Sequence, residues 1–248
     1  MKTTVVAVIN QKGGTGKTTT TINLGSALAK LGKKVLLVDL DPQSNLSYSL
    51  AVPSTAGTLA DVFLGTKKLE DILTEKDGLW VAPGSNELVD IEISLVSQPE
   101  RESFLKSILS DAKGFDYVLI DCPPSLSVLT LNALSAAHEV IIPLQMEVLT
   151  LQGLDQIMQT VGKVKKAFNP KLKIKGIVVV MFDVRRKLSL EVLQYLKENV
   201  EERIFESQIR LNVKLAEAPS FGKSILDYDA SSYGAKDYKA LAEEFVQT

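Results

Sequence analysis

A glycine-rich segment near the start of the sequence has the residue types that bind phosphate. It reads Lys12, Gly13, Gly14, Thr15, Gly16, Lys17, Thr18 and Thr19. In the pattern G-x-x-x-x-G-K-[ST], glycines let backbone N–H groups close around phosphate oxygens, the lysine reaches the β- and γ-phosphates, and the hydroxyl binds Mg²⁺. Gly16, Lys17 and Thr18 match this pattern, whereas Gln11 replaces its first glycine. We therefore predict a variant phosphate-binding loop with a second lysine, Lys12.

Three aspartates lie at the ends of apolar runs that are typical of buried strands. Asp121 follows one such run, where an aspartate can hold Mg²⁺ directly or through water. The alternative is a helix cap, because the two prolines that follow suit a helix start. Asp39 and Asp41 are two residues apart at a strand end, so their side chains point in similar directions. Two carboxylates close to a bound triphosphate repel it and each other unless a cation lies between them. We predict that Thr18 and Asp121 bind the metal, that Asp39 belongs to its outer shell, and that Asp41 positions or activates the attacking water.

The composition excludes several other kinds of site. Cys122 and His138 are the only cysteine and the only histidine among 248 residues, which excludes an internal disulfide, Ser-His-Asp catalysis and cysteine-rich or histidine-rich metal sites. The net charge of −2 requires any nucleic-acid surface to be local. No apolar run of about eighteen residues and no secretion signal is present, so we expect a cytosolic protein without a membrane span.

Apolar runs and amphipathic stretches alternate along the chain. Strands are predicted at 4–9, 34–39, 79–83, 117–121, 139–144 and 175–181. A helix is predicted after the glycine-rich loop, ending at Gly32, and others near 58–64, 86–96, 100–112, 126–137, 151–168, 188–200 and 232–246. This alternation indicates an α/β fold, with a mostly parallel central β-sheet flanked by helices on both faces. We predict one domain over residues 1–248, with the loop, Asp39 and Asp121 at the carboxyl ends of the strands, where ligands bind.

Four segments together resemble the ParA/Soj chromosome- and plasmid-partitioning ATPases. They are residues 12–19, Asp39 to Asn45, Asp121 to Ser125 and Leu215 to Lys223. That family belongs to the deviant Walker A group of P-loop proteins, which also includes MinD and the nitrogenase iron protein. The resemblance extends from Val5 to Phe245 and implies a P-loop ATPase that binds ATP and Mg²⁺ in the loop. It also implies an ATP-dependent homodimer with ATP sandwiched between the subunits.

In the resembled family, the early lysine acts across the dimer interface. The resemblance implies that Lys12 contacts the phosphates of the partner subunit, while Lys17 and the loop amides hold those of its own. A lysine supplied in trans acts like an arginine finger, which contributes about 10³–10⁵ in rate. The alternative for Lys12 is a solvated loop residue.

The resemblance also implies ATP-dependent, nonspecific binding of double-stranded DNA and a ParB-like protein that stimulates hydrolysis, hence association with the nucleoid. A local basic surface is available, because nine lysines and arginines between Lys163 and Lys187 are opposed by Asp183 alone. By position in the motifs, the predicted DNA contacts are Arg185, Arg186, Lys187 and Lys214. For each of them the alternative is a solvated surface charge.

One segment departs from the family pattern. The family usually has Ile-Pro-Arg where this chain has Ile209, Arg210 and Leu211. The missing proline is commonly near the base, so the base-binding loop is expected to differ. Met181, Phe182 and Arg210 are assigned to the nucleotide, with packing at a strand end as the alternative for the first two.

Several residues have simpler interpretations. Trp80 is expected in the core, Cys122 as a small buried residue, and His138 as a capping or surface group. Glu147 is placed either at the dimer interface or in solvent. Three other functions remain for comparison: a MinD-like positioning ATPase on a membrane, an iron–sulfur reductase, and a small-molecule phosphotransferase on the same fold. The acidic residues at 243–244 disfavour the first, and a dimer that shares only Cys122 falls short of the four thiolates that the second needs.

Overall fold

The computed structural model describes residues 3–247, which form a seven-stranded sheet with helices on both faces. The strands are β1 (Thr4–Val8), β2 (Val35–Asp39), β3 (Thr74–Lys76), β4 (Leu79–Ala82), β5 (Tyr117–Asp121), β6 (Glu139–Gln145) and β7 (Lys173–Val180). Their order is β3-β4-β2-β5-β1-β6-β7, and all neighbours are parallel except β3 and β4. The predicted α/β class with a mostly parallel sheet is confirmed.

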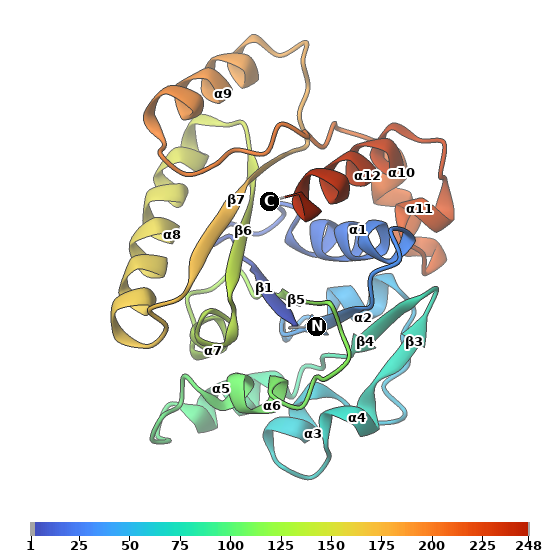
Figure 1. The fold of residues 1–248 in the computed structure, drawn as a ribbon, viewed down its shortest axis with the longest axis vertical. Coiled ribbons are helices and arrows are strands. Elements are labelled where there is room, and N and C mark those ends of the chain that lie inside the picture. The colour runs from blue at the N-terminus through green and yellow to red at the C-terminus, as the bar shows by residue number, and fades with distance from the viewer. Residues whose placement is uncertain (1–2, 248) are drawn as a thin grey trace.

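Each face of the sheet has its own hydrophobic core. On one face, shown to the right of the sheet in Figure 1, helices α1 (Lys17–Lys30), α2 (Asn45–Ser49), α11 (Ile225–Tyr228) and α12 (Tyr233–Val246) contribute to the core. The other face is covered by α3 (Leu59–Phe63), α4 (Leu69–Ile72), α5 (Leu88–Leu95), α6 (Phe104–Leu109), α7 (Val128–Ala136), α8 (Val148–Ala167) and α9 (Lys187–Asn199). The central strands are buried on both sides, which explains why their sequences are continuous apolar runs.

The sequence patterns predicted the long elements and missed most of the short ones. All six predicted strands are present with ends within two residues, and β5 matches at both ends. The edge strand β3 and the short helices α2, α4, α10 (Val213–Glu217) and α11 were not predicted. These elements have three to five residues, too few to repeat a hydrophobic period.

Helix α1 begins at the phosphate-binding loop and packs against α12. The apolar side of α12 is buried, including Leu241 and Phe245. Between the two helices, the hydroxyls of Thr20 and Tyr238 are hydrogen-bonded at 3.2 Å, and both residues are fully buried. The position of α1, and thus of the loop before it, therefore depends on α12.

The register of three neighbouring strands places the predicted site residues together. Val8 and Asp39 both pair with Asp121, so β1, β2 and β5 end level with one another. The glycine-rich loop follows β1 at this side, which we call the carboxyl edge of the sheet. The opposite side, where β6 and β7 begin with Glu139 and Lys173, is called the amino edge.

Candidate functional site

The glycine-rich loop is curled by two left-handed backbone positions. Gly14 and Gly16 have φ of 73° and 78°, a region that side chains with a Cβ rarely adopt. Gly16 is the N-cap of α1, so the helix N-terminus and its free N–H groups face the loop. Lys17 is buried, and its Nζ donates to the Lys12 carbonyl at 3.4 Å. Burial lowers the pKa of Lys17, and nearby carboxylates oppose that shift.

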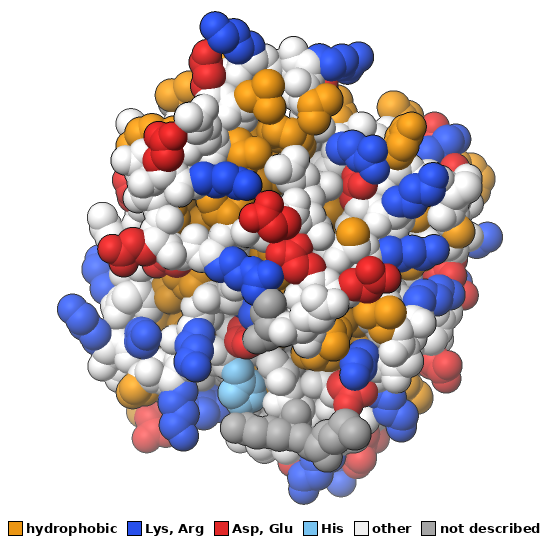
Figure 2. Space-filling view, turned by 45° about the horizontal axis from the view of Figure 1, so that its top comes forward, with side chains coloured by type: hydrophobic (Ala, Val, Ile, Leu, Met, Phe, Trp, Pro, Cys, Tyr) orange, Lys and Arg blue, Asp and Glu red, His pale blue; other side chains and the backbone are white. Residues whose placement is uncertain are grey.

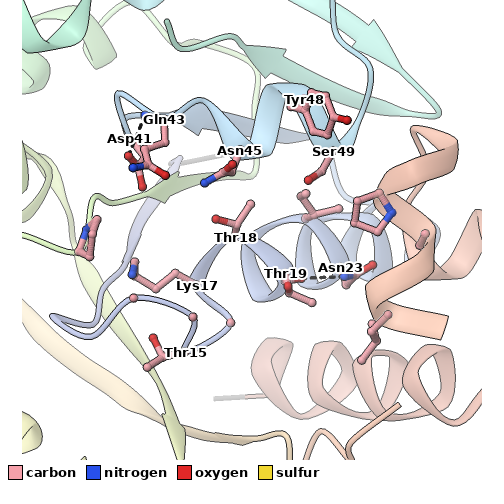
Figure 3. Close-up of a pocket in the computed structure, with 18 of the residues that line it drawn as sticks. Thr15, Lys17, Thr18, Thr19, Asn23, Asp41, Gln43, Asn45, Tyr48 and Ser49 are labelled. Carbon is pink, nitrogen blue, oxygen red and sulfur yellow. Dashed lines mark hydrogen bonds between the residues drawn. The ribbon is translucent and has the colours of Figure 1, made fainter. Parts of the chain in front are cut away.

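A cavity of about 600 Å³ opens above this loop. Gly13 to Thr19 line one side of it, and Asp41, Gln43, Asn45, Tyr48 and Ser49 line another. In Figure 3, Lys17 and Thr18 lie on the loop and helix, with Asp41 and Asn45 across the cavity. The predicted phosphate-binding residues and the predicted water-positioning residue therefore share one cavity, whereas Lys12 is absent from its lining.

Two of the three metal residues predicted from the sequence, Thr18 and Asp121, are in direct contact. The Thr18 hydroxyl donates to Asp121 Oδ2 at 2.6 Å. Asp121 is fully buried, and burial together with the charge of Asp39 raises its pKa to about 8. A carboxylate in this position is stabilised by a nearby cation.

Asp39 is held from one side and lacks a partner on the other. The backbone N–H and the hydroxyl of Ser47 both donate to Asp39 Oδ2, at 2.8 and 2.6 Å. The second oxygen, Oδ1, is buried without a hydrogen-bond partner. Burial raises the pKa of Asp39 to about 6, against the effect of the Ser47 hydrogen bonds. Gly84 closes the site from behind, since a Cβ there would lie 2.6 Å from the Asp39 carbonyl.

These donors fit Mg²⁺ bound together with phosphate. Mg²⁺ is usually held by one or two carboxylates and by substrate phosphates, with water completing its shell. Thr18 and Asp121 supply a hydroxyl and a carboxylate, and the orphaned Asp39 Oδ1 lacks a polar partner. Among residues 3–247, no group of three or more histidine, cysteine or acidic residues is arranged to hold a metal without such additional ligands.

Lys12 extends away from the cavity of its own chain. Its Nζ forms an ion pair with Glu147 Oε2 at 3.0 Å, and about half of each side chain is exposed, 50% and 41%. The Lys12 backbone N–H donates to Asn10 Oδ1 at 3.0 Å, and Asn10 is anchored in turn to the Pro143 carbonyl. The base of Lys12 is therefore fixed, while its ammonium group is accessible.

A second cavity, of about 240 Å³, adjoins the loop beside α1. It is lined by Gly16, Thr19, Met181, Arg210 and Asn212, among others. Of the three residues that were assigned to the nucleotide beyond the loop, Met181 and Arg210 line this cavity and Phe182 does not.

Met181 lines both cavities, whereas the Arg210 side chain at the second cavity is already paired within the chain. Phe182 is buried in the core and lines neither cavity, so its side chain follows the packing alternative. The Arg210 guanidinium is paired with Asp237, with Nε 3.0 Å from Oδ2, and stacks 4.2 Å from the Tyr233 ring centre. Met181 has a left-handed φ of 52°, and the side chain that follows it, Phe182, packs into the core.

The four predicted DNA contacts lie in two segments that a backbone bridge joins. Phe182 pairs with Arg210, which brings the start of α9 close to the start of α10. Arg185 is 83% exposed and makes two hydrogen bonds of 2.9 Å to Asp183. Lys187 pairs with Glu191 at 3.5 Å, and Lys214 with Glu217 at 2.9 Å. Arg186 is exposed at the N-cap of α9.

The residues with simpler interpretations behave largely as expected. Trp80 packs half-buried against the core, 6.4 Å from the Phe115 ring. Cys122 is fully buried, and burial raises the pKa of its thiol. His138 Nδ1 accepts from the Val5 N–H at 2.9 Å, so the ring links the starts of β1 and β6. No helix among the described residues is long and apolar enough to cross a bilayer.

Two positioning residues were missed by the sequence interpretation. Ser47 holds Asp39, and Gln145 donates to the Gly14 carbonyl at 3.1 Å. The strand-end pattern that pointed to Asp39 gives no signal for a serine eight residues later on an unpredicted helix. Gln145 ends β6, and a neighbouring parallel strand end was the available signal.

Comparisons with known proteins agree with this geometry. A family model described as "AAA domain" matches residues 3–174. The chromosome partitioning protein ParA of Caulobacter vibrioides is 44% identical over 98% of this chain and 93% of that protein. The chromosome-partitioning ATPase Soj of Treponema pallidum is 46% identical over 96% and 95%. Cobyrinic acid a,c-diamide synthase from Mycobacterium smegmatis, solved with ADP and magnesium, is 37% identical with a TM-score of 0.87, covering 99% of this chain and 95% of that one.

Proposed function

The chain belongs to the ParA/Soj family of chromosome-partitioning ATPases, and from this premise we propose a cycle for it. It binds ATP with Mg²⁺, dimerises around the nucleotide, binds DNA nonspecifically as the dimer, and returns to monomers when it hydrolyses ATP. In this proposal, residues 1–248 act as one P-loop ATPase domain associated with the nucleoid. The observation that carries it is the set of Lys17, Thr18 and Asp41 around one cavity, with Asp121 bonded to Thr18.

The chain's own residues have separate tasks at the phosphates. The N–H groups of residues 13–19 and the ammonium of Lys17 bind phosphate oxygens at the α1 N-terminus. Thr18 and Asp121 would hold Mg²⁺, with Asp39 in its outer shell. Mg²⁺, when bound, neutralises charge that develops on the transferred phosphoryl group.

Asp41 orients the attacking water in this proposal. Its Oδ1 accepts from the Gln43 N–H at 3.0 Å, which fixes the carboxylate at the wall of the cavity. Its position across the cavity from the loop suits a group that binds water rather than phosphate. Hydrolysis, as opposed to ATP binding, is therefore assigned to Asp41.

Lys12 completes the site of the partner subunit. Its absence from the lining of its own cavity and its accessible ammonium support this role. Dimerisation then exchanges the Glu147 ion pair for the partner's phosphates. An exposed ion pair contributes about 0–1 kcal/mol of stability, so breaking the contact between Lys12 and Glu147 costs little free energy.

DNA binding is assigned to the surface around the start of α9 and α10. Arg185, Arg186, Lys187 and Lys214 contact phosphates, which requires charge rather than base-specific geometry. A ParB-like partner stimulates hydrolysis and thereby releases the DNA. Three of the four side chains are paired with acidic residues in the free chain, so binding exchanges these ion pairs for phosphates.

An Asp41→Ala variant tests this cycle. With ATP we expect dimers that remain bound to duplex DNA and hydrolysis reduced to background, measured by gel filtration, DNA retention and phosphate release. Asp90→Ala, an exposed aspartate on α5, is the matched control and should behave as wild type. Equal DNA binding by Asp41→Ala with and without ATP contradicts the cycle.

A small-molecule ligase is the second candidate. It is favoured by the similarity to the Mycobacterium smegmatis structure, which is that of a cobyrinic acid a,c-diamide synthase. The partitioning relatives are more similar in sequence, at 44–46% identity, which favours the first proposal. Stimulation of ATP hydrolysis by duplex DNA supports partitioning, whereas stimulation by a small carboxylic acid with an amide donor supports the ligase.

A MinD-like membrane role is less well supported. It needs an apolar helix face that is free to enter a bilayer. The apolar side of α12 packs against the core beside α1, with Tyr238, Leu241 and Phe245 at 0–1% exposure. The described part of this helix is therefore already committed to the fold.

A further inference from the structure

A dense lysine cluster lies where α8 turns into β7, far from the residues assigned to DNA. We call it the amino-edge patch. It consists of Lys163, Lys165, Lys166, Lys171 and Lys173. All five side chains belong to exposed residues, and none makes an ion pair within 4.0 Å among residues 3–247. Lys175, the next lysine, is different because it is largely buried and paired with Glu139 at 3.3 Å.

The turn that presents the amino-edge patch is held by several hydrogen bonds. The Asn169 side chain donates to the carbonyls of Leu134 and Ala137, at 2.9 and 2.7 Å. The Leu172 N–H donates to the Asn169 carbonyl, and the Lys173 N–H to the His138 carbonyl. The lysines are therefore attached to a fixed backbone, and little backbone freedom remains to be given up when they bind.

The patch is well separated from the nucleotide cavity. Lys173 begins β7, and Met181 at the cavity follows the end of that strand. At about 3.3 Å per residue, the two positions are roughly 25 Å apart. Figure 2 shows several Lys and Arg side chains close together on the side where the chain's single histidine, in pale blue, reaches the surface.

The residue types in the patch indicate which polyanion it fits. Five unpaired lysines in a chain of net charge −2 form a local positive field that attracts phosphate. Lysine contributes point charges without the bidentate geometry that reads bases, so sequence specificity is not expected. Between residues 150 and 180, Phe168 is the only large apolar side chain in the exposed class, which leaves little surface to enter a bilayer.

We propose that the amino-edge patch is a second contact surface for the phosphate backbone of duplex DNA. It rests on the proposed function for the identity of the polyanion. Because the patch lies at the opposite edge of the sheet from the cavity, its affinity does not depend on ATP. It contributes a weak, salt-sensitive attraction to DNA in every nucleotide state, while stable binding through the surface around Arg185 requires the ATP-bound dimer and ends on hydrolysis.

The test replaces all five lysines by glutamine. Binding to a nonspecific duplex is measured with no nucleotide, with ADP and with ATP, over a range of salt concentrations, together with basal ATP hydrolysis. We expect nucleotide-free affinity at low salt to fall about tenfold or more, and the salt slope to fall by about 0.9 for each phosphate that the variant no longer neutralises. Basal hydrolysis should be unchanged, because no patch residue lies at the cavity.

The matched control removes the same number of charges elsewhere. Its substitutions are Lys34→Gln, Lys106→Gln, Lys113→Gln, Lys236→Gln and Lys239→Gln, all at exposed positions. If this control loses as much nucleotide-free DNA affinity as the patch variant, the loss reflects the change in net charge and not the patch, and the proposal is overturned. Unchanged binding by the patch variant also overturns it, even if ATP-dependent binding persists and supports the cycle.

Two further measurements distinguish the amino-edge patch from the ATP-dependent surface and from a lipid-binding surface. If wild type binds DNA equally in all nucleotide states and the patch variant loses that binding, the patch is supported while the proposed cycle fails. Vesicles with phosphatidylserine are the lipid control. Stronger patch-dependent binding to these vesicles than to DNA, at the same salt, would assign the surface to a membrane and contradict the proposal.

Discussion

The two edges of the sheet place polar groups in opposite ways. At the carboxyl edge, Asp39 and Asp121 are fully buried, and their hydrogen bonds to Ser47 and Thr18 are 2.6–2.8 Å long. At the amino edge, the five lysines of the patch are exposed and unpaired. Buried groups depend on individual partners, whereas exposed charges act by their sum. Single substitutions should therefore disrupt the carboxyl edge, and the amino edge should change in proportion to the charge removed.

The largest effect is expected at Lys12. In Lys12→Ala, the nucleotide of the partner subunit loses the ammonium group that stabilises the negative charge of the transition state. The rate of ATP hydrolysis should therefore fall by about 10³-fold or more. ATP-dependent dimers should also disappear. Steady-state phosphate release and gel filtration measure both, with Lys106→Ala on α6 as the control. If Lys12→Ala hydrolyses ATP at the wild-type rate, the claim that single substitutions disrupt the carboxyl edge is wrong.

A smaller effect is expected at Ser47. The Ser47→Ala substitution removes a hydroxyl that donates to Asp39 and accepts from the Gly84 N–H at 3.1 Å. The free energy of unfolding should fall by about 1–3 kcal/mol, since a buried group loses its partner. Urea denaturation provides the measurement. Ser110→Ala, at an exposed serine, should stay within about 0.5 kcal/mol, and an equal loss there would remove the distinction between buried and exposed groups.

The buried carboxylates predict a particular pH dependence in EDTA. The pKa of Asp121 is raised to about 8 and that of Asp39 to about 6, so the folded chain binds more protons than the unfolded chain above pH 4. Stability should therefore fall as pH rises from about 4 to 8, by at most about 1.4 kcal/mol per pH unit for each group. Urea unfolding at pH 5 and 8 tests this, and Asp121→Asn should flatten the profile. A wild-type stability that rises between these pH values would contradict the burial argument.

The smallest effect is expected for Arg185. In Arg185→Ala, the slope of ATP-dependent DNA affinity against salt should fall by about 1, because one phosphate is no longer neutralised. Asp183→Asn is the complementary control, since it releases Arg185 from two hydrogen bonds and should strengthen binding. Unchanged salt dependence in Arg185→Ala would move the ATP-dependent surface elsewhere on the molecule.

The strands and the phosphate-binding loop were predictable because their signals are local. The apolar run before Asp121 defines β5 at both ends, and the glycine spacing defines the loop. The contact between Thr18 and Asp121 followed from placing two motifs at one edge of a parallel sheet. The fold class and the ends of the strands were therefore sufficient to predict the position of the candidate site from the sequence.

The remaining details depend on contacts between distant positions. Arg210 pairs with Asp237, 27 residues away, and nothing in the sequence near Arg210 indicates this partner. Phe182 points into the core because the backbone at Met181 is left-handed, a conformation that alternation along a strand does not predict. Ser47 lies on the short helix α2, which has no detectable period. Side-chain direction beyond strand ends could therefore not be predicted from the sequence.

The contact of α1 with α12 has a consequence during synthesis of the chain. Thr20, in the first turn of α1, depends on Tyr238 for a buried hydrogen-bond partner. The ribosome makes α12 roughly 200 residues after α1, which takes about 10–40 s at about 5–20 residues per second. Until then, the phosphate-binding loop is attached to a helix with an uncovered side. We therefore expect nascent chains that lack α12 to bind ATP poorly, so that DNA loading and subunit pairing begin only after this segment has left the ribosome.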